Sequence, residues 1–242
     1  MTWHTGRLCG VDLETTGVDL ESDRIVTACV VQCGGGQPTE SATWLADPGI
    51  EISEAAAAVH GITTDRARTD GRLAADVVAE VVEAVTAAAR GGLPVIVMNA
   101  VFDLTLLDRE ARRHGVQPLA DAVGGELTVV DPRVLDKHLD QFRRGSRKLE
   151  DLARHYRVEH GGAHRADADA LAACRIVWRM GQTFPDLSRV PLDQLHQLQM
   201  QWAREQAEAL AGYFRRTPGK EHQADSVRSD WPLIPHQRNT TA

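Results

Sequence analysis

The sequence lacks an excess of positive charge. Its 242 residues include 27 Lys and Arg against 34 Asp and Glu, which gives a formal net charge of −7. A general basic surface for nucleic acid is therefore excluded. A polyanionic partner would have to be bound locally or through metal ions.

Long apolar runs and paired cysteines are absent as well. No window approaches the roughly 18 apolar residues of a membrane helix, and residues 1–7 show no apolar run behind a basic start. The 4 cysteines include no Cys-x-x-Cys pair, which favours reduced core thiols over a disulfide or a zinc site. We therefore expect a cytoplasmic protein with no membrane segment.

The composition, with 43% hydrophobic and 25% charged residues, is that of a globular protein with one large domain or two small ones. We predict strands from residue propensity, helices from the spacing of apolar residues, and turns from the positions of glycine. The predicted strands and helices alternate along the second half of the domain. The predicted strands are residues 7–13, 25–33, 41–45, 94–98 and 127–130, and the predicted helices are residues 70–90, 102–114, 149–155, 166–180 and 192–216. This order predicts an α/β fold with a mixed sheet.

The C-terminal third predicts an extension of this domain. Leu195, Leu198 and Trp202 lie on or near one side of the last predicted helix, which would cover this chain's own core or bind a partner, and we favour the first. The chain beyond is proline-containing and aperiodic, and its apolar segment 231–235 would dock on this chain or on a partner. The expected organisation is a main domain over residues 7–182, a helical extension over 183–216 and a flexible or loosely docked tail over 217–242.

Asp12 and Glu14 stand at the end of the first predicted strand. Because they are two residues apart, both carboxylates point to the same side of the sheet. Two like charges at the end of a buried strand are unfavourable unless a cation lies between them, and a hard divalent ion is the natural candidate. Two solvated carboxylates at a strand end are the alternative.

Two further segments place an acid at a helix start. Asp103 follows an apolar strand, with Asn99 as a possible N-cap, and both features have complete structural explanations. Asp169 lies deeper in a small, apolar helix and needs a partner if it is buried. His164, which precedes that helix, is a candidate acid or base near neutral pH or a loop residue that only packs.

The three segments together form a more specific pattern. Asp-x-Glu-Thr-Thr-Gly at 12–17, Asn-x-x-Phe-Asp at 99–103 and His-Arg-Ala-x-x-Asp-Ala at 164–170 resemble the motifs of the DEDD superfamily of 3′–5′ exonucleases. The His-containing branch of that superfamily includes bacterial proofreading epsilon subunits, ribonuclease T and oligoribonuclease. The resemblance covers about residues 7–182 and implies a ribonuclease H-like mixed sheet flanked by helices, with a C-terminal helical extension.

The resemblance also implies a site. In the family, four carboxylates, which match Asp12, Glu14, Asp103 and Asp169, hold two divalent metal ions, and oxygen ligands suit Mg²⁺ or Mn²⁺. His164 matches the residue that accepts a proton from the attacking water. The other branch of the family carries a tyrosine where this chain has Arg165.

Substrate positions follow from the same resemblance. The residues matching family positions near the terminal nucleotide are Leu13, Thr15, Thr16, His60, Asn99 and Phe102. For Phe102 we favour a core position, since an aromatic residue at a helix start usually packs inward. The segment 143–148 carries four positive charges and would either contact phosphates or form a solvated loop.

The function that this resemblance implies is a metal-dependent 3′–5′ exonuclease acting on single-stranded or frayed DNA ends, in proofreading or repair. Its expected partners are a DNA 3′ end and a DNA polymerase subunit. An exoribonuclease of the ribonuclease T or oligoribonuclease type is the alternative. A non-catalytic interaction module is disfavoured because no motif carboxylate is replaced.

Overall fold

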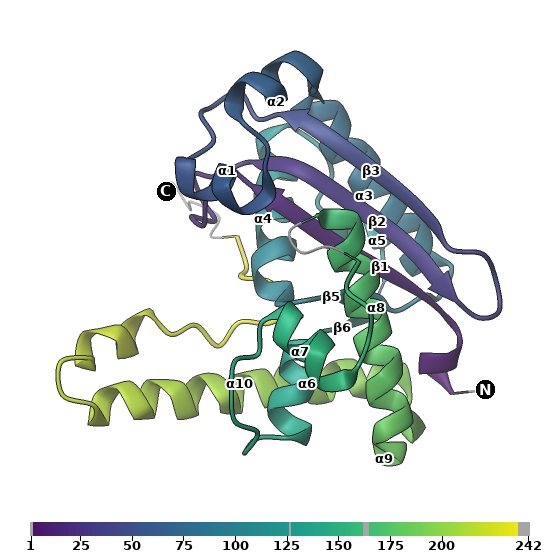
Figure 1. Ribbon diagram of the computed structural model, residues 1–242, viewed down its shortest axis with the longest axis vertical. Coiled ribbons are helices and arrows are strands. Elements are labelled where there is room, and N and C mark those ends of the chain that lie inside the picture. Colours follow the sequence, from purple (N-terminus) through teal and green to yellow (C-terminus); the bar gives the residue numbers. More distant parts are fainter. Residues whose placement is uncertain (1, 126, 162–164, 237–242) are drawn as a thin grey trace.

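The computed structural model describes residues 2–125, 127–161 and 165–236. These residues build one mixed sheet with strand order β4-β3-β2-β1-β5-β6, flanked by helices (Figure 1). Its strands are β1 (Arg7–Thr15), β2 (Ile25–Gly34), β3 (Glu40–Asp47), β4 (Arg72–Leu73), β5 (Val95–Val97) and β6 (Val129–Val130). The predicted α/β fold with a mixed sheet is confirmed.

The first three strands form the predicted antiparallel meander. β1 pairs with β2 and β2 with β3, whereas β5 is parallel to β1 and β6 is parallel to β5. The turn after β2 contains Gly34, Gly35 and Gly36, all with φ between 65° and 84°. Only glycine adopts three such left-handed conformations in a row without strain, so this turn explains the tight return into β3.

Helices cover both faces of the sheet and enclose two main hydrophobic cores. The first core is packed under α3 (Ala74–Arg90), α4 (Ala100–Arg113) and α5 (Leu119–Val123). The second lies under α7 (Leu149–Tyr156), α8 (Ala166–Thr183), α9 (Pro185–Arg189) and the start of α10 (Leu192–Arg216). None of the helices in the described part of the chain is both long and apolar enough to cross a membrane.

Several short elements were not predicted from the sequence. They are the 3₁₀ helix η1 (Trp3–Thr5), α1 (Glu54–His60), α2 (Thr64–Asp70), β4, α5, α6 (Pro132–Leu139), α9 and the 3₁₀ helix η2 (Glu221–Ser226). The Ser53 and Thr63 side chains cap α1 and α2 by accepting backbone N–H bonds from Ala56 and Arg66. The helix predicted from residue 70 begins at Ala74, because Gly71 ends α2 first.

Helix α10 completes the sheet at the β6 edge. Gln199 on α10 is fully buried; its Oε1 accepts the Asp131 N–H at 2.8 Å and its Nε2 donates to the Val129 carbonyl at 3.0 Å. His196 Nδ1 accepts the Val129 N–H at 3.1 Å. Side chains of α10 therefore take the hydrogen-bonding place of a further strand. The first half of the helix packs on this chain's own core, as we favoured, whereas its second half projects beyond the sheet beside the returning tail (Figure 1).

The chain beyond α10 also docks on its own domain. It turns back along α10 in Figure 1, and the Trp231 side chain is buried, with its ring 5.1 Å from that of His196. Further on, the Ile234 N–H donates to the Thr105 hydroxyl at 2.9 Å. The apolar segment of the tail therefore contacts α4 and α10.

Candidate active site

The first two carboxylates come from the end of β1. Asp12 lies opposite Cys29 and Glu14 opposite Thr27 in the β1–β2 ladder. Val11 and Leu13, which alternate with them, belong to the core on the other face. Both acids therefore project toward α8, on the same side of the sheet, as their spacing predicts.

Gly10 brings α8 close to β1. A Cβ atom at Gly10 would lie 2.6 Å from the Ala170 carbonyl oxygen and 2.7 Å from Cys174 Sγ, closer than real Cβ atoms approach. The backbone of α8 therefore contacts a strand position that has no side chain. This close packing places Asp169, one residue before Ala170, against the end of β1.

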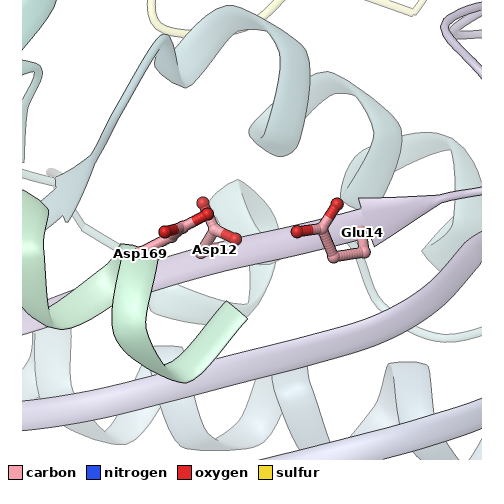
Figure 2. A group of neighbouring side chains, drawn as sticks. All are labelled: Asp12, Glu14 and Asp169. Atoms are coloured by element: carbon pink, nitrogen blue, oxygen red, sulfur yellow. The ribbon is translucent and has the colours of Figure 1, made fainter. Parts of the chain in front are cut away.

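Three carboxylates meet where α8 crosses β1. One oxygen each of Asp12, Glu14 and Asp169 lies within 4.8 Å of the others. Figure 2 shows Asp12 and Glu14 on the strand, with Asp169 entering from the first turns of α8. The predicted convergence of the first and third motifs is therefore present in the structure.

The second motif reaches the same place from α4. Asp103 is buried, and its Oδ1 accepts a hydrogen bond from the backbone N–H of Leu13 at 3.1 Å. Its charge raises the pKa of Asp12, as do those of Asp169 and Glu14. Asp103 lies outside the group of three whose oxygens meet within 4.8 Å, but it is the fourth acid of this cluster.

The carboxylates are electrostatically unfavourable in the absence of a cation. Burial is the main cause that raises the pKa of Asp12 well above its usual value, and like charges add to it. Burial also raises the pKa of Glu14 to about 7 and that of Asp103 to about 8. A cluster of oxygen ligands with this repulsion fits hard divalent cations such as Mg²⁺ or Mn²⁺ and not a Cys/His zinc site.

A histidine that the sequence analysis did not select contacts the cluster. His160 Nε2 lies 2.6 Å from Asp169 Oδ1. His164, the predicted proton acceptor, lies outside the described residues. The signal for His160 was available, since it is a second histidine in the same His-Gly-Gly-Ala-His segment.

The residues after Glu14 form a rigid turn. The Thr16 hydroxyl donates to Asp23 Oδ1 at 2.6 Å and accepts the Arg24 N–H at 3.0 Å. The Thr15 hydroxyl donates to the Gly17 carbonyl at 2.5 Å. Both threonine hydroxyls therefore form hydrogen bonds within this turn, and these bonds fix the backbone that follows Glu14.

His60 lies against the same turn. Its Nδ1 accepts the Ile62 N–H at 3.1 Å, so a neutral ring carries its proton on Nε2, which is 3.3 Å from the Thr15 carbonyl oxygen. His60 is therefore near the site, as predicted, and its ring orientation is set by α1 and the following loop.

Asn99 does not cap α4 in the predicted way. Its side chain makes no capping hydrogen bond, and its backbone adopts a left-handed conformation with φ of 62°. Asp131 replaces it, because its carboxylate accepts the N–H groups of Asn99 and Ala100 at 3.1 and 3.0 Å. The Asn99 amide oxygen accepts a hydrogen bond from Arg133. Asp131 was missed because it is far from Asn99 in sequence.

Phe102 is half-buried and does not occupy the core position that we favoured. The reason is its place in the first turn of α4, where Asp103 and Leu104 take the inward positions. Phe102 therefore stays partly exposed in the same turn as Asp103.

A cavity of about 640 Å³ adjoins Glu14. It runs over β2 and β3 toward α2, and its lining includes His60, Arg66 and Arg165. The Trp44 indole lies on the opposite face of the sheet, where it donates to Glu80 at 2.7 Å. The cavity therefore places cationic side chains and the His60 ring next to the acid cluster.

The basic segment 143–148 is partly used for structure. Arg143 and Arg147 form ion pairs with the fully buried Asp136 at 3.0 and 2.8 Å. Tyr156 also donates to Asp136, at 2.9 Å. Two of the four cations therefore stabilise the loop, which leaves the exposed Arg144 and Lys148 as the remaining positive groups of the segment.

Comparison with known proteins identifies the family. Residues 9–177 match the family described as Exonuclease (RNase_T), so the chain belongs to this exonuclease family. The match confirms the resemblance to DEDD-type exonucleases, whereas the His-containing branch stays a prediction.

Curated relatives carry the same region inside much longer chains. The chain is 29% identical over 169 residues to a PolC-type DNA polymerase III of Lacticaseibacillus paracasei, covering 70% of this chain and 11% of that protein. It is 24% identical over 196 residues to the PolC-type enzyme of Caldanaerobacter subterraneus, covering 81% and 13%. The chain thus spans about a tenth of the length of these relatives.

Solved structures share the fold. The zinc-bound form of E. coli exonuclease I in a complex with single-stranded DNA superposes with a TM-score of 0.64 at 20% identity, over 75% of this chain and 41% of that chain. Exonuclease I from Methylocaldum szegediense gives 0.60 at 19% identity, over 86% and 46%. These similarities confirm the ribonuclease H-like arrangement of the exonucleases.

Proposed function

We propose that the protein is a metal-dependent 3′–5′ exonuclease that removes nucleotides from single-stranded or frayed DNA ends and releases nucleoside 5′-monophosphates. The observation that carries the proposal is the convergence of Asp12, Glu14 and Asp169, with Asp103 behind them, in a chain that belongs to an exonuclease family. DNA as the substrate is supported by the names of the relatives, which are DNA polymerases, and by the DNA-bound exonuclease I.

The four carboxylates would hold two divalent ions, Mg²⁺ or Mn²⁺. When bound, such ions would lower the pKa of a water molecule that they hold and would stabilise the negative charge on the scissile phosphate. Burial and mutual repulsion make the ionised carboxylates unfavourable. A bound cation would relieve this repulsion, so the site favours cations. The acidic chain can thereby approach a polyanion without a basic surface.

The chain's own groups would position the substrate and move protons. His164 would accept the proton of the attacking water, and the Leu13 backbone would lie next to the 3′ end. The Asp103 carboxylate fixes that backbone through the Leu13 N–H. The cavity beside Glu14, with Arg66 and Arg165, would receive the terminal nucleotides through phosphate contacts.

The cellular setting belongs to the same proposal. Relatives in which the exonuclease region lies inside a polymerase chain support a role in proofreading, with a DNA polymerase as partner. A stand-alone repair nuclease in the cytoplasm would use the same site. Exonuclease assays on a matched and a mismatched primer, with and without a replicative polymerase, distinguish the two settings.

A substrate panel tests the proposed activity. Purified protein with Mg²⁺ or Mn²⁺ is offered 5′-labelled single-stranded DNA, duplex DNA with a 3′ mismatch, and RNA of the same sequence. We expect a ladder that shortens from the 3′ end of DNA and disappears with EDTA and in Asp12→Asn. Faster degradation of RNA would replace the DNA assignment by the exoribonuclease alternative, and no degradation with either metal would refute the enzyme.

A further inference from the structure

Two cysteines outside the acid cluster line a separate cavity. Cys33 is the last residue but one of β2 and Cys174 lies on α8, and both side chains belong to the second hydrophobic core. Both line a cavity of about 400 Å³. All four cysteines of the chain are free thiols. This pair is therefore the point at which a small reagent can meet two neighbouring thiols.

The turn after β2 keeps the cavity open on the Cys33 side. Gly34, Gly35 and Gly36 form its wall and contribute no side chains, and their left-handed φ values exclude most other residues. His4 contributes to another part of the wall, and its buried Nδ1 has no hydrogen-bond partner among the described residues. The cavity therefore admits a small polar molecule.

The charges around Cys33 favour a reactive sulfur. The hydrogen bond from Cys174 lowers the pKa of the Cys33 thiol, and the positive charges of Arg175 and Arg7 act in the same direction, against the effect of burial. The same hydrogen bond, together with burial, raises the pKa of Cys174. Cys33 is also the more exposed side chain of the two, at 8% against 1%. We therefore assign Cys33 as the nucleophile of the pair and Cys174 as its partner.

We propose that Cys33 and Cys174 are a peroxide-reactive thiol pair, in which Cys33 is oxidised by a hydroperoxide and Cys174 closes a disulfide. In the first step the Cys33 sulfur attacks the O–O bond of hydrogen peroxide, which forms an S–O bond, reduces the peroxide to water and leaves a sulfenic acid. In the second step the Cys174 sulfur attacks Cys33, forms the S–S bond and breaks the S–O bond. The departing oxygen leaves as a second water with the Cys174 proton.

The other two cysteines serve as internal controls. Cys9 is fully buried in the core on the opposite face of the sheet, and Cys29 is fully buried further along β2. Burial raises the pKa of each to about 12, so both are protonated and inaccessible. The disulfide would also join β2 to the helix that carries Asp169.

Hydrogen peroxide treatment of the whole native protein, followed by alkylation and peptide mass spectrometry, tests the pair. We expect a Cys33–Cys174 disulfide that dithiothreitol reverses, formed at least about tenfold faster than any modification of Cys9 or Cys29. In Cys174→Ala we expect a Cys33 sulfenic acid that dimedone traps. Cys29→Ala is the matched control and should form the disulfide at the wild-type rate.

Two results would overturn the proposal. One is oxidation of Cys33 no faster than that of Cys29 in the native protein, and the other is a modified Cys33 with Cys174 still free. Near-ultraviolet circular dichroism of each variant verifies native packing. Because the reaction is measured on sulfur and not on nucleic acid, its failure leaves the proposed exonuclease untouched.

Discussion

His160 Nε2 lies 2.6 Å from Oδ1 of Asp169, so a histidine contacts one of the four acids directly. A cation bound by Asp169 would compete with His160 for the same carboxylate. His160 and His164 are therefore expected to play different parts, although they stand in one short segment.

We expect His164→Ala to lower the exonuclease rate by about 10²–10⁴-fold, because a general base is lost. His160→Ala should keep the rate within about tenfold and lower the Mg²⁺ concentration needed for half-maximal activity, because the competitor of the cation is removed. Initial rates over a Mg²⁺ titration give both quantities. A larger loss in His160→Ala than in His164→Ala would reverse the two assignments.

Asp12→Asn separates catalysis from stability. We expect a loss of activity of about 10³-fold or more, since several kcal/mol of charge stabilisation depend on the ligand set. The metal-free variant should unfold at a higher temperature than the wild type, because a buried charge among like charges is removed. Thermal unfolding in EDTA measures this. Glu83→Gln, an exposed acid on α3, is the control that should change neither quantity.

Stability without metal should fall as the pH rises. The raised pKa values of Glu14, about 7, and Asp103, about 8, mean that the folded protein binds more protons than the unfolded chain above roughly pH 4. Because stability decreases with pH wherever the folded state holds more protons, the loss extends from about pH 4 to about pH 8. Excess Mg²⁺ should flatten this decline, since the cation replaces the protons. Unfolding temperatures in EDTA that rise over this range would contradict the assignment.

Gly10→Ala is expected to damage the site from a distance. The added methyl would meet the Ala170 carbonyl, so α8 must move away from β1 at a cost of about 1–3 kcal/mol. Asp169 moves with the helix, and we expect weaker Mg²⁺ binding along with the lower stability. Gly125→Ala is the control, because a Cβ there meets no atom within 4 Å. Equal metal affinity in wild type and Gly10→Ala would show that α8 absorbs the methyl group.

Gln199→Leu tests the contact between α10 and the sheet. The substitution leaves the Val129 carbonyl and the Asp131 N–H buried without their partner, and we expect a loss of about 2–4 kcal/mol in the free energy of unfolding. Gln201→Leu removes only an exposed bond to Glu205 and should stay within about 0.5 kcal/mol. Urea denaturation followed by circular dichroism gives both values. Similar losses for the two variants would contradict the assigned role of Gln199.

The sequence predicted the parts of the structure that depend on local pattern. Asp12 and Glu14 lie on one side of β1 because side chains alternate along a strand, and the three motifs together predicted that Asp103 and Asp169 would join them. The long helices and the five main strands were found with shifts of a few residues at their ends. These elements carry strong periodicity, which a single sequence reveals.

The remaining features depend on contacts between distant segments. Asp131 caps α4 through Asn99 and Ala100, and Gln199 binds the edge of β6, but no local pattern marks either residue. Arg147 was a candidate for phosphate contact from its charge, whereas the buried Asp136 binds it. Such partners become visible only when the tertiary structure brings them together.

The covering of the β6 edge has a consequence for shortened versions of this chain. The family match ends at residue 177, and a chain cut soon after it would lack His196 and Gln199. Its parallel edge strand would then present free backbone N–H and C=O groups beside an exposed apolar surface. Such an edge pairs readily with the same edge of another molecule. The shortened protein would therefore self-associate, and a soluble minimal nuclease must extend through α10.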